Sequence, residues 1–166
     1  AVVVRLVGLN QARGLIASRG IKHRHLASIL EVVEGPDATV FPDRPATDRA
    51  CAVVAEVFRG TSLRSVIRRE RLGVDRSVAW VIRIAEALRE IHRNGGAHGA
   101  LSPFSILAKA HGRAISPVLS QLIVPPLALF ASPERLTGQG PSPSDDLWAL
   151  GVLLYCLLTG TVPFLG

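Results

Sequence analysis

Methionine is absent from this 166-residue sequence, cysteine occurs only twice, and aromatic residues make up 5% of it. Charged residues are scarce at 19%, whereas hydrophobic residues reach 48%. Disordered segments have the opposite balance, so this composition predicts a packed globular structure. Because no methionine opens the sequence, we expect it to be a central piece of a longer chain.

The two cysteines, Cys51 and Cys156, are far apart, and neither has a second cysteine at metal-ligand spacing. This arrangement favours two reduced, buried thiols over a disulfide or a zinc site, and it is typical of a cytoplasmic protein. The longest apolar run, residues 147–158, is shorter than the roughly 20 residues that cross a bilayer. We therefore predict a fully buried helix there and no membrane span.

Lysine is nearly absent as well. The 19 basic residues include only Lys22 and Lys109 as lysines, and the net charge is +6. The densest basic group is formed by four arginines: Arg64, Arg68, Arg69 and Arg71. Such a patch can bind nucleic acid or anionic lipid, but the sequence has few aromatic residues and no nucleic-acid motif. We predict a solvated helix face and no nucleic-acid partner.

Acidic residues are missing from a long central window. Between Glu90 and Glu134 the sequence contains neither aspartate nor glutamate. A carboxylate is the usual ligand for Mg²⁺ and a common general base, so this window lacks the groups for either role. The histidines His23, His25 and His111 have no clustered partners, and we predict no metal site.

Hydrophobic patterns predict strands at three places in the first part of the sequence: residues 2–7, 26–33 and 52–57. A weak helix is expected at residues 10–19, and a proline-rich loop at residues 35–49. A short helix follows from Ser62.

The second part reads as mainly helical. Apolar residues recur at helical spacing in one long segment: Val78, Val81, Ile82, Ala85, Leu88 and Ile91. Asp75 is its expected N-cap, and Asn94 precedes two glycines that end it. Residues 105–108 and 113–115 flank a hairpin turn. The apolar helix is expected to begin at Ser142 and to end at Gly160. Strands followed by helices predict an α+β fold.

Several of these segments resemble Ser/Thr protein kinases, in particular the bacterial kinases of the eukaryotic type. Residues 98–107 (His-Gly-Ala-Leu-Ser-Pro-Phe-Ser-Ile-Leu) match in register the family's catalytic loop, His-Arg-Asp-Leu-Lys-Pro-x-Asn-Ile-Leu. Residues 132–134 resemble the Ala-Pro-Glu motif, and residues 146–155 resemble the buried Asp-x-Trp-x-Leu-Gly helix. The resemblance implies a two-lobe fold, with a partial N-lobe and hinge at residues 1–58 and a partial C-lobe at residues 59–166.

The first half is similar to this family more loosely. Arg5 stands where the family has its phosphate-binding Lys, and Gly14 where it has the Glu that pairs with that Lys. The implied candidate nucleotide cleft consists of six residues: Arg5, Ala55, Glu56, Val57, Phe58 and Leu107. We expect this cleft to require no cofactor and to be able to take ATP without Mg²⁺.

The positions that act on phosphate in these kinases are replaced here. Ala100 stands at the catalytic Asp, Ser102 at the Lys, Ser105 at the metal-binding Asn, and Val118 close to the Asp of the Asp-Phe-Gly motif. The positions that support the fold in the family are retained: His98, Glu134, Asp146, Trp148 and Gly151. The resemblance therefore implies a degenerate member with no intact catalytic residue and no metal ligand.

Three hypotheses follow. The first is a pseudokinase, a regulatory or binding module for a protein partner or a neighbouring domain of the same polypeptide. The second is an active or weakly active kinase that recruits acids from outside the carboxylate-free window: Glu56, Glu86, Glu90 or Asp145. The third is a sensor that binds a nucleotide without metal.

Overall fold

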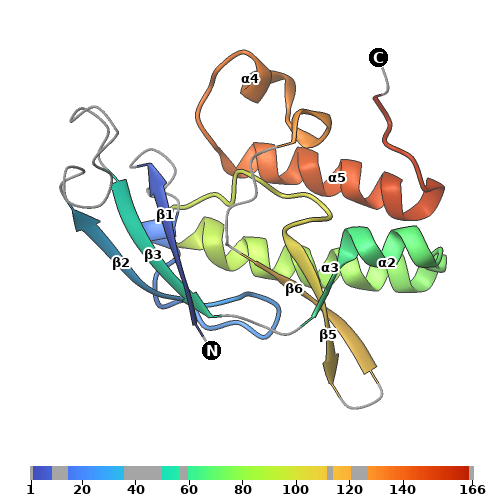
Figure 1. Cartoon of the computed structure of the whole chain (residues 1–166). Helices are drawn as coiled ribbons and strands as arrows, with labels where there is room; N and C mark the ends of the chain where they lie inside the picture. Colours follow the sequence, from blue (N-terminus) through green and yellow to red (C-terminus); the bar gives the residue numbers. More distant parts are fainter. Residues whose placement is uncertain are drawn as a thin grey trace.

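The computed structural model describes residues 2–8, 15–35, 50–56, 60–111, 114–120 and 127–164. The first part of the chain forms an antiparallel sheet, drawn from blue to teal in Figure 1, with the strand order β1-β3-β2. These strands are β1 (Val2–Gly8), β2 (Ile29–Gly35) and β3 (Ala50–Glu56). A small core of Leu15, Ile29, Cys51 and Val53 lies against this sheet.

The second part is mainly helical. The short strand β4 (Thr61–Ser62) leads into α2 (Leu63–Arg69) and the long helix α3 (Val74–Arg93). The hairpin β5 (Ile106–His111) and β6 (Ala114–Leu119) joins β4 in a second antiparallel sheet. The short helices η2 (Ala128–Phe130) and α4 (Pro133–Leu136) precede α5 (Pro143–Thr159), which packs along α3 (Figure 1). The predicted α+β class, a small sheet beside a helical body, is confirmed.

A short β-bridge joins the two parts. The sequence patterns did not distinguish the residues of this bridge from those of β2. Leu26 bridges to Leu119, because Ala27 N–H donates to Leu119 O and Leu119 N–H donates to His25 O, both at 2.8 Å. Leu26 therefore belongs to the main core, which it shares with residues of α3 and α5, and β2 begins only at Ile29. The start of the predicted strand 26–33 was wrong, because this apolar run pairs with two different strands. Its first residue, Leu26, bridges to β6, and the residues from Ile29 pair with β3.

Helix α3 has the predicted length, but its N-cap and part of its buried face differ from the prediction. Gly73 is the N-cap, and Asp75 lies inside the first turn, where its charge favours the helix dipole. Val78 and Ile82 are exposed, at 40% and 53%. The buried face instead carries Trp80 and other residues: Ser77, Ile84, Ala87, Leu88 and Ile91.

Helix α5 begins and ends where the sequence predicts. Ser142 and Asp145 form a reciprocal capping box at its start. Gly160 ends it with a left-handed φ of 81°. The prediction of a fully buried helix is wrong, because one side exposes four large residues: Leu147, Trp148, Tyr155 and Leu158. Within the described residues no helix is long and apolar enough to cross a membrane.

Other predictions can be checked in the same way. The hairpin at His111 is confirmed, and Pro117 is tolerated because β6 is an edge strand of its sheet. Cys51 and Cys156 are buried and form no disulfide, as predicted, and burial raises the pKa of Cys156. Residues 15–17 are helical, but Gly14, the loop at 36–49 and the predicted boundary between residues 58 and 59 lie outside the described residues.

Candidate functional site at the loop from His98 to Leu107

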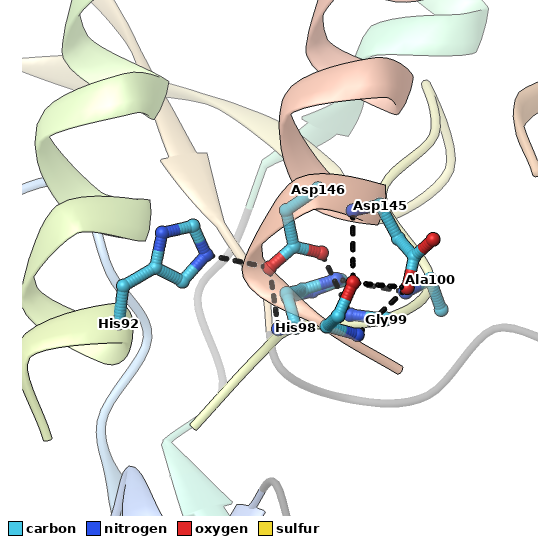
Figure 2. Close-up of polar contacts among 7 residues, drawn as sticks. His92, His98, Gly99, Ala100, Asp145 and Asp146 are labelled. Atoms are coloured by element: carbon cyan, nitrogen blue, oxygen red, sulfur yellow. Dashed lines mark hydrogen bonds and ion pairs between the residues drawn. The ribbon is translucent and has the colours of Figure 1, made fainter. Parts of the chain in front are cut away.

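The carboxylate of Asp146 holds the start of the loop 98–107. Asp146 lies in the first turn of α5 and is 1% exposed. Its Oδ2 accepts the backbone N–H of His98 and its Oδ1 that of Gly99, each at 2.8 Å (Figure 2). Charge-assisted bonds of this kind are stronger than neutral ones. A retained acid therefore fixes the loop backbone and has its oxygens occupied in doing so.

Two histidines extend this arrangement. His92, at the end of α3, donates from Nε2 to Asp146 Oδ2 at 2.8 Å, which ties α3 to α5 (Figure 2). His98 Nε2 donates to the carbonyl of Ser120 at 3.0 Å, and His98 Nδ1 accepts the N–H of Ala100 at 3.3 Å. Both ring nitrogens of His98 are engaged within the fold. The sequence singled out His98, but nothing marked His92 as a partner of Asp146.

The hydroxyls in the middle of the loop bond to the loop itself. Ser105 Oγ donates to Ser102 O at 2.9 Å and accepts Ser102 N–H at 3.1 Å. Ser102 Oγ accepts the N–H of Phe104 at 3.4 Å. Ser102 and Ser105 are each 1% exposed. These two serines close the loop on itself, so its turn is maintained without a ligand.

The segment 118–120 lies beside the loop, and Ser120 is the residue of this segment that bonds to Ser105 and His98. Ser120 N–H donates to Ser105 O at 2.7 Å, and its carbonyl accepts from His98. Val118, the residue chosen from the sequence, is buried at 1% exposure in β6 and pairs with Leu107. Spacing in the sequence could not locate the residue that stands at the Asp of the Asp-Phe-Gly motif, because the length of the β5–β6 hairpin determines which residue lies there. Neither residue carries an acid.

Apolar and charged side chains surround Ala100. Ala100, Leu127, Phe130 and Arg135 line a cavity of about 20 Å³, enough for about one water molecule. Leu127 and Phe130 come from a stretch in which the sequence shows no periodicity, so no signal marked them as neighbours of Ala100. The methyl group of Ala100 offers no proton acceptor to this cavity.

Asp145 also lines this cavity, but its carboxylate is occupied. Ser132 Oγ donates to Asp145 Oδ1, while the N–H and hydroxyl of Ser142 donate to Oδ2 at 2.7 and 2.8 Å. Burial opposes ionisation of Asp145, but these hydrogen bonds and the charge of Arg135 outweigh it and hold the pKa of the carboxyl below its usual value. Asp145 thus joins α4 to α5.

The structure places part of the candidate nucleotide cleft. Ala55 is buried at the end of β3, where the backbone of Val3 in β1 pairs with it. Glu56 is half-buried, and its N–H donates to Ser28 O at 2.9 Å. Leu107 is half-buried in β5. Arg5 lies in β1 opposite Val53.

Val57 and Phe58 of the same cleft lie outside the described residues. Of the remaining retained positions, Glu134 is exposed in α4, and Trp148 stacks on Phe164 with ring centroids 5.5 Å apart. Gly151 is exposed in α5. These three residues lie apart from the hydrogen bonds that hold the loop.

Curated proteins similar to this chain are protein kinases. The serine/threonine-protein kinase PknA of Corynebacterium glutamicum is 29% identical over 163 residues, which span 90% of this chain and 33% of that protein. PkaB of Streptomyces coelicolor is 30% identical over 169 residues, spanning 89% and 37%. Drp72 of Corynebacterium efficiens is 29% identical over 170 residues, spanning 95% and 31%.

The chain is protein-kinase-like. Its small sheets and helical body are consistent with a partial kinase-like fold, as the sequence predicts. No protein-family model matches it. The chain spans about a third of the length of the curated relatives named above. Similarity to kinases therefore describes the fold, and the chemistry has to be argued from the residues of the loop.

The kinase-like loop does not fit Mg²⁺. This ion requires oxygen ligands in near-octahedral geometry, and proteins usually supply one or two carboxylates. Within the loop and the segment 114–120 the side-chain oxygens are serine hydroxyls, and those of Ser102 and Ser105 bond within the loop. In the part of the chain that the structure describes, no group of three or more His, Cys, Asp or Glu side chains could hold a metal ion.

Proposed function

We propose that this chain is part of a pseudokinase, a kinase-like module that does not transfer phosphate and acts by binding. The observation that carries the proposal is the state of the loop from His98 to Leu107. Asp146 holds its start and two buried serines close its middle, while Ala100 supplies no base. Phosphoryl transfer depends on positioning of the reacting groups and on charge neutralisation by metal ions. A loop without a base at Ala100 and without metal ligands provides neither.

The rival proposal, an active kinase that borrows acids, is disfavoured by where those acids lie. Asp145 is occupied by Ser132 and Ser142. Glu90 pairs with Arg93 at 3.3 Å near the end of α3, and Glu86 lies one turn earlier on the same helix. Glu56 belongs to β3 in the other sheet.

A nucleotide sensor is a narrower version of the binding module. Adenine can be recognised by backbone groups, and the small side chain of Ala55 limits how far this strand fills the cleft. Glu56 N–H is committed to Ser28 O, so we assign the recognition of adenine to Val57 and Phe58. In this version ATP binds without Mg²⁺.

The binding module would act on a protein partner or on a neighbouring domain of the same polypeptide. We place it in the cytoplasm, because its two cysteines are buried and form no disulfide. A reducing compartment keeps such thiols in this state.

The test compares phosphate transfer with nucleotide binding in the intact protein. Transfer of radiolabelled phosphate from ATP to the protein or to casein is measured beside an active bacterial kinase as the positive control. Thermal unfolding is followed with ATP in EDTA and with ATP in Mg²⁺. We expect no transfer. Stabilisation that is equal in EDTA and Mg²⁺ supports the sensor, and no stabilisation supports a module that binds only proteins. Transfer together with a large Mg²⁺-dependent shift contradicts the proposal.

A further inference from the structure

A second hollow is lined by residues of β4, α2, the start of α3 and the β5–β6 hairpin. It has a volume of about 390 Å³, far larger than the cavity beside Ala100. We call it the hairpin groove. Among the cleft residues whose side chains the structure describes, Ala55, Glu56 and Leu107, none lines the hairpin groove.

The floor of the hairpin groove is apolar and made of small side chains. Ala108 and Ala110 are two residues apart in β5 and therefore point to the same face of the sheet. Val66 of α2 and Ile115 of β6 add larger walls, and Ile115 is 45% exposed. Because both floor residues are alanines, the groove is deep enough for an aliphatic side chain of a ligand. Val66 and Ile115 in the walls would contact that side chain.

The rim of the hairpin groove is positively charged. Two guanidinium groups, those of Arg69 and Arg76, line it together with one carboxylate, that of Glu70. Glu70 is already paired with Arg76 at 3.2 Å, on an exposed part of the surface. Arg69 has no such pair among the contacts described, and the exposed Arg68 precedes it in the last turn of α2. The charge left over at this rim is therefore positive.

We propose that the hairpin groove binds an extended, acidic segment of a partner protein that carries aliphatic side chains. Its aliphatic groups would occupy the space above Ala108 and Ala110, and its carboxylates would pair with Arg69. Nucleic acid is disfavoured, because single strands bind on aromatic platforms and none of the described residues that line the groove is aromatic. This inference rests on the proposed binding function and gives that function a site and a partner chemistry.

Fluorescence anisotropy with the intact protein tests the proposal. The probe is a short fluorescein-labelled peptide in which leucine alternates with glutamate, and the comparison peptide has lysine in place of glutamate. We expect the glutamate peptide to bind at least about tenfold more tightly, a difference of about 1.4 kcal/mol. Equal binding of the two peptides, or no binding of either, overturns the proposal.

Variants locate the site. Ala110→Tyr fills the floor and is expected to weaken binding of the glutamate peptide about tenfold or more. Leu136→Tyr adds the same ring at an exposed position of α4, away from the groove, and should change nothing. Arg69→Glu should reverse the preference toward the lysine peptide, whereas Arg89→Glu should not, because Arg89 lies about 20 Å further along α3 than Arg76. Equal effects of the groove variants and their controls overturn the assignment.

Three further outcomes decide the choice of partner and separate this inference from the proposed function. Displacement of the glutamate peptide by single-stranded DNA through Arg69 would overturn the choice of partner. Absence of phosphate transfer together with absence of peptide binding defeats the groove and leaves the pseudokinase standing. Phosphate transfer with intact peptide binding defeats the pseudokinase and leaves the groove as a docking site.

Discussion

Asp146 supports the loop more than any other side chain described here, and its replacement tests that role. Asp146→Asn keeps the shape but removes the charge that accepts three hydrogen bonds, from His98, Gly99 and His92. The side-chain NH₂ group of the asparagine would also face these three groups, which are themselves hydrogen-bond donors. We expect the free energy of unfolding to fall by about 2 kcal/mol, measured by urea denaturation.

Asp75→Asn is the matched control for this change. Asp75 is exposed in the first turn of α3, where its charge is worth about 0.5 kcal/mol. If the two variants lose the same stability, Asp146 does not hold the loop.

His25 makes the stability of the fold depend on pH. Burial lowers the pKa of His25; the hydrogen bond from its Nδ1 to Pro117 O opposes this, and the charges of Arg83, His23 and Arg24 add to it. Above about pH 6.5 the ring is neutral in both states and adds no pH dependence. Below that value the unfolded chain takes up the proton first, so the free energy of unfolding decreases as pH falls.

We therefore expect His25→Gln to flatten the loss of stability between about pH 7 and pH 5. Urea denaturation at several pH values measures the slope. His23→Gln, two residues away and less buried, should retain most of it. A slope that survives the removal of His25 would assign the pH dependence to another group.

At the scale of the element, two glycines of α5 should respond in opposite directions to the same substitution. Gly160 has a φ of 81°, so Gly160→Ala forces an L residue into the left-handed region and should cost about 1 kcal/mol. Gly151 is exposed within the helix, and an added Cβ would meet nothing within 4 Å. Gly151→Ala should stabilise the chain by about 0.8 kcal/mol, because alanine is the better helix former.

Chemical denaturation of both variants beside the parent measures these effects. Destabilisation by Gly151→Ala would mean that another part of the protein packs against this face of α5. The two glycines then could not be explained by backbone propensity alone.

The ends of the helices could be predicted better than the faces that they bury. The ends of α5 follow from local chemistry, a capping box at Ser142 and a left-handed glycine at Gly160. Its exposed side does not, because Leu147 and Trp148 are as apolar as the residues that face the core. On α3, Val78 and Ile82 fit the helical period as well as Trp80 does. Only the positions of α5 and β6, which pack against α3, determine which of these residues is buried.

At the scale of the whole molecule, the sequence predicts which groups the loop lacks but not how the loop is completed. The missing carboxylates between Glu90 and Glu134 are a matter of composition and need no structure. That Ser105 closes the turn onto Ser102, and that Ser120 instead of Val118 bonds to Ser105 and His98, depends on long-range packing of the hairpin. Spacing alone cannot supply either fact.

The absence of a metal ligand leads to a prediction for the intact protein. Mg²⁺ should add nothing to any stabilisation by ATP, because the hydroxyls of Ser102 and Ser105 are bonded within the loop. Ser120→Asp introduces a carboxylate at the residue whose backbone bonds to both Ser105 and His98. In this variant Mg²⁺ should tighten ATP binding about tenfold over EDTA, measured by titration with thermal unfolding as the readout.

Ser116→Asp is the control for the added charge. Ser116 lies in β6, the strand that ends just before Ser120, but bonds to Arg83, 3.2 Å away, so a carboxylate there pairs with a guanidinium and remains unavailable to Mg²⁺. Each variant is compared with itself in EDTA, so a change in its basal stability cancels. A Mg²⁺ response in the parent protein would mean that a carboxylate outside the central window reaches the loop. A response in Ser116→Asp as large as in Ser120→Asp would mean that charge alone, and not position beside Ser105, governs the binding of the metal.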